Sequence, residues 1–329
     1  MRRSDELSKI SDVAGHGRHP RPTDRTARNV SETATFDLHL TKRQILATVC
    51  LLAARTGLGE KGNSVARDYV IKLGTMLFTM VEPQKGHEVE YNRWYERDHF
   101  YGGVLTGAWS FAGDRFVATK AMKNLRYPAD TPMTPDPTIG SYLALYWVLD
   151  GHHDEWNRWS VDTVKMLHAT GRMFAERTHI HTLLYNNEWS IQKENWSTPA
   201  ELALDRNYAG LVVNVGELAE GATHADIETW TRETWAPSAM ASTWGPDLVL
   251  NATPLPLLDD APPDVPRTPN ADRRFLQLHF LDHTPDHGWA DGYAKYGDQL
   301  NASGIATHLW TSPFIQTVFG TDTYTDQLW

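Results

Sequence analysis

Residues 90–94 read EYNRW and residues 155–159 read EWNRW, and the organisation of the whole chain follows from this recurrence at an offset of 65 residues. A tryptophan returns at the matching place in a third stretch, as Trp230 of IETW (residues 227–230), and Tyr293 is the nearest equivalent in a fourth. Self-similarity at a spacing of this size indicates a repeated structural unit. We therefore interpret the chain as four copies of one unit.

Each copy has the same predicted order of strand, helix and strand. Apolar runs rich in β-branched and aromatic residues predict the strands, and the stretches between them predict helices. The predicted strand, helix and strand of the four copies are 72–83, 87–101 and 109–119; 141–150, 153–171 and 178–192; 207–217, 225–242 and 247–258; and 274–282, 287–303 and 307–319.

The predicted strands carry apolar residues on both faces. In residues 141–150 (SYLALYWVLD), Tyr142, Ala144 and Tyr146 alternate with residues that are also apolar. A strand that is covered on one face only would alternate apolar and polar side chains. We therefore predict an α+β fold of two tandem βαββαβ halves, residues 72–192 and 206–329, with helices on one side of each sheet and a facing sheet on the other. Proline-rich loops at equivalent places in the two halves, 127–137 and 253–269, support this duplication.

The N-terminal residues differ from the rest of the chain. Residues 1–35 are polar and offer little to bury, which predicts a disordered tail. Residues 36–71 predict a helical extension, with Thr41 as a cap and Gly57 and Gly59 as terminators.

Composition excludes several classes of partner. The 329 residues carry a net charge of −10 without a basic stretch, which argues against nucleic-acid binding. The single cysteine, Cys50, can form no disulfide within the chain, and no secretory signal is evident, so we expect a cytoplasmic protein. The longest apolar run near the start is too short to span a bilayer, so we expect no membrane association.

One helix resembles a known family. Residues 92–95 read NRWY, and His99 follows them, after a strand that ends in Val81-Glu82-Pro83. This pattern resembles the N-x-W-Y-x-x-x-H helix of EthD-like proteins of the dimeric α+β barrel superfamily. The resemblance implies that two ferredoxin-like copies, separate chains in that superfamily, are fused here and close into one intramolecular α+β barrel. Val164 and Trp235 stand where the second and third repeats would place the histidine.

The same resemblance leaves the chemistry open. The superfamily includes cofactor-free oxygenation, isomerisation, dehydration, decarboxylation and, in some fused members, haem chemistry. Fold therefore does not decide the function.

The first predicted helix gathers the main candidate catalytic residues. On an α-helix, Asn92, Tyr95, Glu96 and His99 would lie along one face. His99 would be the acid or base, Asn92 and Tyr95 would orient or polarise a carbonyl or hydroxyl, and Trp94 would wall the pocket with Glu96 nearby. The alternative is a packing corner in which His99 only hydrogen-bonds backbone.

Further histidines are candidates for substrate binding. His179 and His181 lie two apart on a predicted strand, so we expect them on one face, and Tyr146 completes the predicted pocket wall. His279 interrupts an apolar run, which either a pocket or an exposed edge strand would explain. No third ligand at a recognisable spacing accompanies the histidine pair, so we expect no metal site.

Four functions remain open at this point. The first is an enzyme without a cofactor that acts on a hydrophobic, aromatic or polycyclic small molecule by elimination, isomerisation or decarboxylation, and is therefore a lyase or isomerase. The second is a cofactor-free monooxygenase. The third is a haem enzyme with His179, His181 or His279 as axial ligand. The fourth is a non-catalytic binding protein. Association into a homodimer also stays open.

Overall fold

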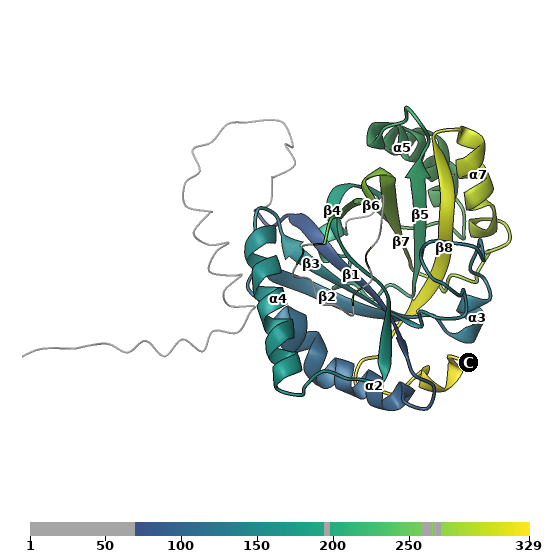
Figure 1. The fold of residues 1–329 in the computed structure, drawn as a ribbon. Coiled ribbons are helices and arrows are strands. Elements are labelled where there is room, and N and C mark those ends of the chain that lie inside the picture. The colour runs from purple at the N-terminus through teal and green to yellow at the C-terminus, as the bar shows by residue number, and fades with distance from the viewer. Residues whose placement is uncertain (1–69, 194–197, 258, 260–264, 266, 268–270) are drawn as a thin grey trace, which may run out of the picture. The chain divides into compact units, whose positions relative to one another are not determined.

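The structure is a computed structural model that describes residues 70–193, 198–257, 259, 265, 267 and 271–329 (Figure 1). The predicted tail (1–35) and all but the last two residues of the predicted helical extension (36–71) lie outside the described residues. In the part of the chain that is described, no helix is both long and apolar enough to cross a membrane.

The first half contains four strands in the predicted order. Its elements are β1 (Leu73–Pro83), α2 (Glu88–Trp94), η1 (Tyr95–Leu105), β2 (Ser110–Val117), α3 (Lys120–Lys123), β3 (Tyr142–Leu149), α4 (His153–Ala169) and β4 (Arg177–Gln192). Helix α3 was not predicted; Thr119 caps it by accepting a hydrogen bond from the backbone N–H of Met122.

The second half repeats this order after the short helix η2 (Ala200–Leu202). Its elements are β5 (Gly210–Leu218), α5 (His224–Trp230), η3 (Thr231–Trp235), α6 (Ala236–Ala241), β6 (Leu248–Leu255), η4 (Ala271–Arg273), β7 (Arg274–Leu281), η5 (Tyr293–Lys295), α7 (Tyr296–Ser303), β8 (Ala306–Gln316) and η6 (Thr325–Gln327). The predicted helix over 287–303 is wrong in its first part. Gly288 has φ of 65°, and this left-handed backbone cannot continue a helix.

The strands form one closed antiparallel barrel in the order β1-β3-β2-β8-β5-β7-β6-β4. Each half therefore has the ferredoxin-like order, β4-β1-β3-β2 in the first and β8-β5-β7-β6 in the second. The halves join unequally. Strands β4 and β6 pair from Leu184↔Leu255 to Gln192↔Leu248, whereas β2 and β8 share only Phe116↔Gln316 and Val117↔Ile315. The predicted fold, two ferredoxin-like halves in one α+β barrel, is confirmed.

Both faces of the sheet are covered, as the strand composition predicts. Barrel-facing side chains such as Phe78, Trp147 and Phe280 pack together in the interior, and all three are fully buried. On the outer face, α2 and α4 lie over the first half, and α5 and α7 lie over the second (Figure 1).

Two helices change geometry at the same point of the repeat. The helix that follows β1 becomes a π-helix directly after Trp94, and the helix that follows β5 does so directly after Trp230. A π-helix has i→i+5 hydrogen bonds, so its residues no longer follow α-helical spacing. The single α-helix predicted over 87–101 is therefore corrected: it continues to Leu105 and is π-helical from Tyr95.

Candidate functional site

A cavity of about 120 Å³ lies in the first half, between the helices η1 and α4 and the outer face of strands β1 and β4. Most of its wall is apolar, and the second half contributes Leu257 and Val265 to it. The polar and ionisable residues in its lining are Thr79, Tyr95, Asn157, Ser160, Arg177, Thr182 and the histidines 99 and 179. Sequence analysis had proposed three of these residues, Tyr95, His99 and His179, and the fold brings them to one cavity.

The imidazole of His99 is held firmly in the cavity wall. One face stacks on Trp94, with ring centroids 4.6 Å apart and an interplanar angle of 17°. The Nε1 of Trp94 donates to the backbone carbonyl of Arg172 at 2.7 Å, which fixes the tryptophan in turn. The ring also packs against Gly103, where a Cβ would lie 2.7 Å from Nδ1 and Cε1.

His99 is neutral at physiological pH. Burial, together with the positive charge of Arg177, lowers the pKa of His99 to about 3. Its Nδ1 is buried and has no hydrogen-bond partner among the described residues. A buried polar atom without a partner is rare in folded proteins and calls for an explanation.

The hydroxyl of Tyr95 meets a second phenol behind the cavity wall. Its oxygen lies 2.9 Å from that of Tyr146, which is fully buried. Burial raises the pKa of Tyr95 and of Tyr146, so both phenols stay protonated. When Tyr146 donates to Tyr95, the Tyr95 hydroxyl proton is free for another acceptor. Tyr146 therefore supports the site and does not line it.

His179 belongs to a chain of hydrogen bonds along the cavity floor. The guanidinium of Arg177 donates to Nε2 of His179 at 3.3 Å, and Nδ1 of His179 contacts the hydroxyl of Thr182 at 2.8 Å. That hydroxyl lies 2.8 Å from the hydroxyl of Thr79. A guanidinium can only donate, so Nε2 accepts and Nδ1 carries the proton. The chain thereby sets the tautomer of His179.

The prediction that His179 and His181 share a face is wrong. The pairing of β4 with β1 shifts between Met80↔His181 and Val81↔His179, so an extra residue, Ile180, is inserted as a β-bulge. The bulge turns His179 toward the helices, while His181 points into the barrel and contacts the Tyr185 hydroxyl at 2.8 Å. Burial lowers the pKa of His181 to about 4, and this residue is not in the cavity lining.

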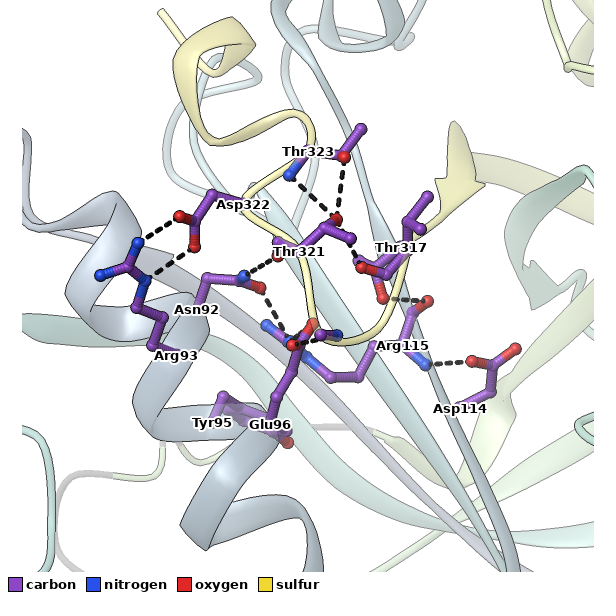
Figure 2. Close-up of polar contacts among 12 residues, drawn as sticks. Asn92, Arg93, Tyr95, Glu96, Asp114, Arg115, Thr317, Thr321, Asp322 and Thr323 are labelled. Carbon is purple, nitrogen blue, oxygen red and sulfur yellow. Dashed lines mark hydrogen bonds and ion pairs between the residues drawn. The ribbon is translucent and has the colours of Figure 1, made fainter.

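Asn92 and Glu96 interact with different residues from those that surround Tyr95 and His99. Both point toward Arg115 of β2, whose guanidinium donates to Asn92 Oδ1 at 2.9 Å and to Glu96 Oε1 at 3.2 Å (Figure 2). Arg115 is fully buried, and its guanidinium carbon lies 4.4 Å from the centroid of the Tyr95 ring. The predicted single face is thus split: Asn92 and Glu96 turn to Arg115, and Tyr95 and His99 line the cavity.

The same pair of side chains fastens the C-terminal segment onto this helix. Asn92 Nδ2 donates to the carbonyl of Thr321 at 2.9 Å, and Glu96 Oε2 accepts from the backbone N–H of Gly320 at 2.8 Å. Arg93 adds a two-pronged contact to Asp322, visible at the left of Figure 2. Asn92 and Glu96 therefore position the helix that carries Tyr95, and neither lines the cavity.

His279 lies in the second half and is fully enclosed. It contacts Gln277 at 3.0 Å and Tyr293 at 3.3 Å, and burial lowers the pKa of His279 to about 3. Gln277 also accepts from Tyr296 at 3.0 Å and donates to Thr231 at 3.1 Å. His279 therefore satisfies a buried polar network and is not on an exposed edge strand.

Sequence reasoning missed Arg177, Thr182, Asn157 and Ser160. One signal could have found Thr182: the pentapeptide THIHT (residues 178–182) recurs as THLWT (residues 307–311) at the corresponding strand of the second half. The other three face the cavity only because the tertiary fold brings α4 against β4.

This cavity does not fit a haem group. Ligands of drug size occupy cavities of about 300–1,000 Å³, several times the volume found here. Of the three predicted axial ligands, His279 and His181 lie outside the cavity, and both ring nitrogens of His179 are engaged. Among the residues described, no group of three or more His, Cys, Asp or Glu side chains is arranged to hold a metal ion.

Comparison with known proteins reveals similarity at the level of structure only. The sequence matches no protein-family model and no curated protein. Among solved structures, an anthrone oxidase-like protein is 8% identical with a TM-score of 0.44, over 76% of this chain and 95% of that chain. A dye-decolorizing peroxidase from Bacteroides thetaiotaomicron VPI-5482 is 8% identical with a TM-score of 0.43, over 80% and 98%. The encapsulated DyP-type peroxidase from Mycobacterium smegmatis is 9% identical with a TM-score of 0.40, over 79% and 96%. Similarities at this level give no information about the reaction.

Proposed function

We propose that this chain is a cofactor-independent enzyme of EthD-like type that moves a proton on a small hydrophobic substrate, leading to isomerisation, elimination or decarboxylation. The observation that carries the proposal is His99: a neutral imidazole, stacked on Trp94, in the wall of an apolar cavity that Tyr95 also lines. The cavity volume of about 120 Å³ favours a single-ring substrate over the polycyclic one considered from the sequence, since engineered cavities of about 150 Å³ accept benzene.

His99 takes the role of base in this proposal, and the role of acid is dropped. With a pKa lowered to about 3, the ring carries no proton to donate near neutral pH. When it accepts a proton from the substrate, burial and the charge of Arg177 oppose the new imidazolium, and its position on the face of Trp94 offsets part of that cost, because a cation over an aromatic ring is stabilised. The substrate anion formed beside it adds a Coulomb attraction that is strong in an apolar site.

Tyr95 is the hydrogen-bond donor in this proposal. Its protonated phenol, backed by Tyr146, donates to the oxygen on which negative charge develops. Asn92, Glu96 and Arg115 act as positioning residues that hold the helix, and the chain from Arg177 to Thr79 sets the orientation of His179.

The test is deuterium incorporation from D₂O into phenylpyruvate, acetophenone and resorcinol, followed by proton NMR. We expect exchange with at least one of these probes, and a loss of about 10²–10⁴-fold in the His99→Gln variant, as is usual for a general base. His308→Gln is the matched control, since it removes a buried histidine of the second half and should leave the exchange rate unchanged. Exchange that survives His99→Gln, or no exchange with any probe, would contradict the proposal. Oxygen uptake in the same reactions would instead indicate the monooxygenase.

A further inference from the structure

The cavity has a counterpart in the second half, built from the repeated pentapeptide. Strand β8 carries the same bulge as β4, because its pairing with β5 shifts between Val215 and Gly216. His308 contacts the Thr311 hydroxyl through Nε2 at 2.7 Å, and His179 contacts the Thr182 hydroxyl through Nδ1 at 2.8 Å, so both histidines reach the same threonine position through different ring nitrogens. Each threonine then contacts the first strand of its own half, Thr79 at 2.8 Å and Asn214 at 2.7 Å. The two halves thus place a histidine beside a β-bulge at the same point of the strand.

In the second half this place is filled by a phenol of the chain itself. The backbone of Tyr127 pairs with Thr311 through hydrogen bonds of 3.2 and 2.8 Å. The Tyr127 ring lies over His308, with centroids 4.9 Å apart and an angle of 33°. Its hydroxyl donates to the carbonyl of Tyr293 and accepts from the backbone N–H of Gly297 at 3.1 Å. Tyr127 therefore occupies the counterpart site as a bound phenol would.

At the first-half cavity the place of this phenol is taken by a leucine. Strands β4 and β6 pair as far as Leu184↔Leu255, and Leu257, two residues beyond the end of β6, lines the cavity together with Thr182. Tyr127 pairs with Thr311, the counterpart of Thr182. Leu257 lines the cavity of about 120 Å³. A phenol ring present in one half is thus absent from the other, and a cavity of single-ring size is found there.

We propose that the substrate of the first-half cavity is a single-ring phenol, bound against His179 as Tyr127 is bound against His308. Its hydroxyl would face α4, the helix that corresponds to α7 and that lines the cavity with Asn157 and Ser160. This inference rests on the proposed function for its catalytic meaning, but the binding it predicts is measured without turnover.

The test uses p-cresol, which is the side chain of tyrosine, and isothermal titration calorimetry on the full chain. The unmodified protein is expected to bind one p-cresol, and to bind it about tenfold more tightly than toluene, which lacks the hydroxyl. Leu257→Tyr supplies the ring from within and should abolish this binding. The reverse exchange, Tyr127→Leu, should create a second site and raise the stoichiometry to two.

Three results would overturn the inference: no binding of p-cresol at millimolar concentration, unchanged binding in Leu257→Tyr, or equal affinity for toluene. Leu257→Tyr decides the matter by itself where Tyr127→Leu does not fold. Binding of p-cresol without proton exchange in any probe would refute the proposed function and leave this inference standing. Proton exchange of phenylpyruvate or acetophenone without binding of p-cresol would refute this inference and leave the proposed function standing.

Discussion

Replacing Gly103 by alanine tests whether His99 is held as rigidly as the structure indicates. The new Cβ would lie 2.7 Å from both Nδ1 and Cε1 of the His99 ring, well inside van der Waals contact. The movement of the ring is restrained, because one of its faces stacks on Trp94 and the backbone carbonyl of Arg172 fixes that tryptophan. The imidazole or the π-helix must therefore move.

The neighbouring glycine provides a matched control. A Cβ at Gly102 would meet only the guanidinium tip of Arg172 at 2.8 Å and a carboxylate oxygen of Asp98 at 3.2 Å, and both are ends of flexible, partly exposed side chains. Alanine is favoured over glycine in a helix by about 1 kcal/mol, and this gain is common to the two variants. The difference between them isolates the clash with His99, for which overpacking predicts roughly 1–3 kcal/mol.

Urea unfolding of the two variants measures this difference directly. We expect Gly103→Ala to be less stable than Gly102→Ala by roughly 1–3 kcal/mol, or by at least about 2 °C in Tm for a domain of this size. The imidazole resonances of His99 in nitrogen–proton correlation spectra should move in Gly103→Ala and stay in place in Gly102→Ala. Equal stabilities together with unmoved resonances would refute the placement of His99.

Three further predictions concern buried charges. Glu96→Gln leaves the buried guanidinium of Arg115 without its carboxylate and should lower the free energy of unfolding by about 3–5 kcal/mol, whereas Glu90→Gln, at an exposed pair, should change it by less than about 1 kcal/mol in the same urea titration. Burial raises the pKa of Asp114 to about 7, so the folded state keeps a proton that the unfolded state releases near pH 4. The free energy of unfolding should therefore decline as pH rises from 4 to 7, and Asp114→Asn should remove that decline in unfolding curves at pH 4.5 and 8. Burial lowers the pKa of His279 to about 3, so between pH 6.5 and 3 only the ring of the unfolded chain becomes protonated. The free energy of unfolding should therefore fall by up to about 1.4 kcal/mol for each pH unit in this range. If His279→Gln does not reduce the pH dependence of this free energy between pH 6 and 4.5, the prediction is contradicted.

The sequence by itself determined the repeat, the order of the strands and the need for cover on both faces of the sheet. These follow from local patterns: apolar residues at both faces of each strand require cover on both sides, and the EYNRW and EWNRW helices mark the units. Periodicity of this kind is a property of neighbouring residues, so it can be read without the fold. It also identified Tyr95, His99 and His179 by residue type.

Only the tertiary structure decided how the candidate residues are divided among different environments. Asn92 and Glu96 turn to Arg115 and to the C-terminal segment, more than 220 residues away in the chain. The bulge at Ile180 separates His179 from His181, although a regular strand would place them together. Such a shift of register depends on which residue of a distant strand is opposite. No local pattern encodes that choice, and the same holds for the fit of Tyr127 against His308 in the other half.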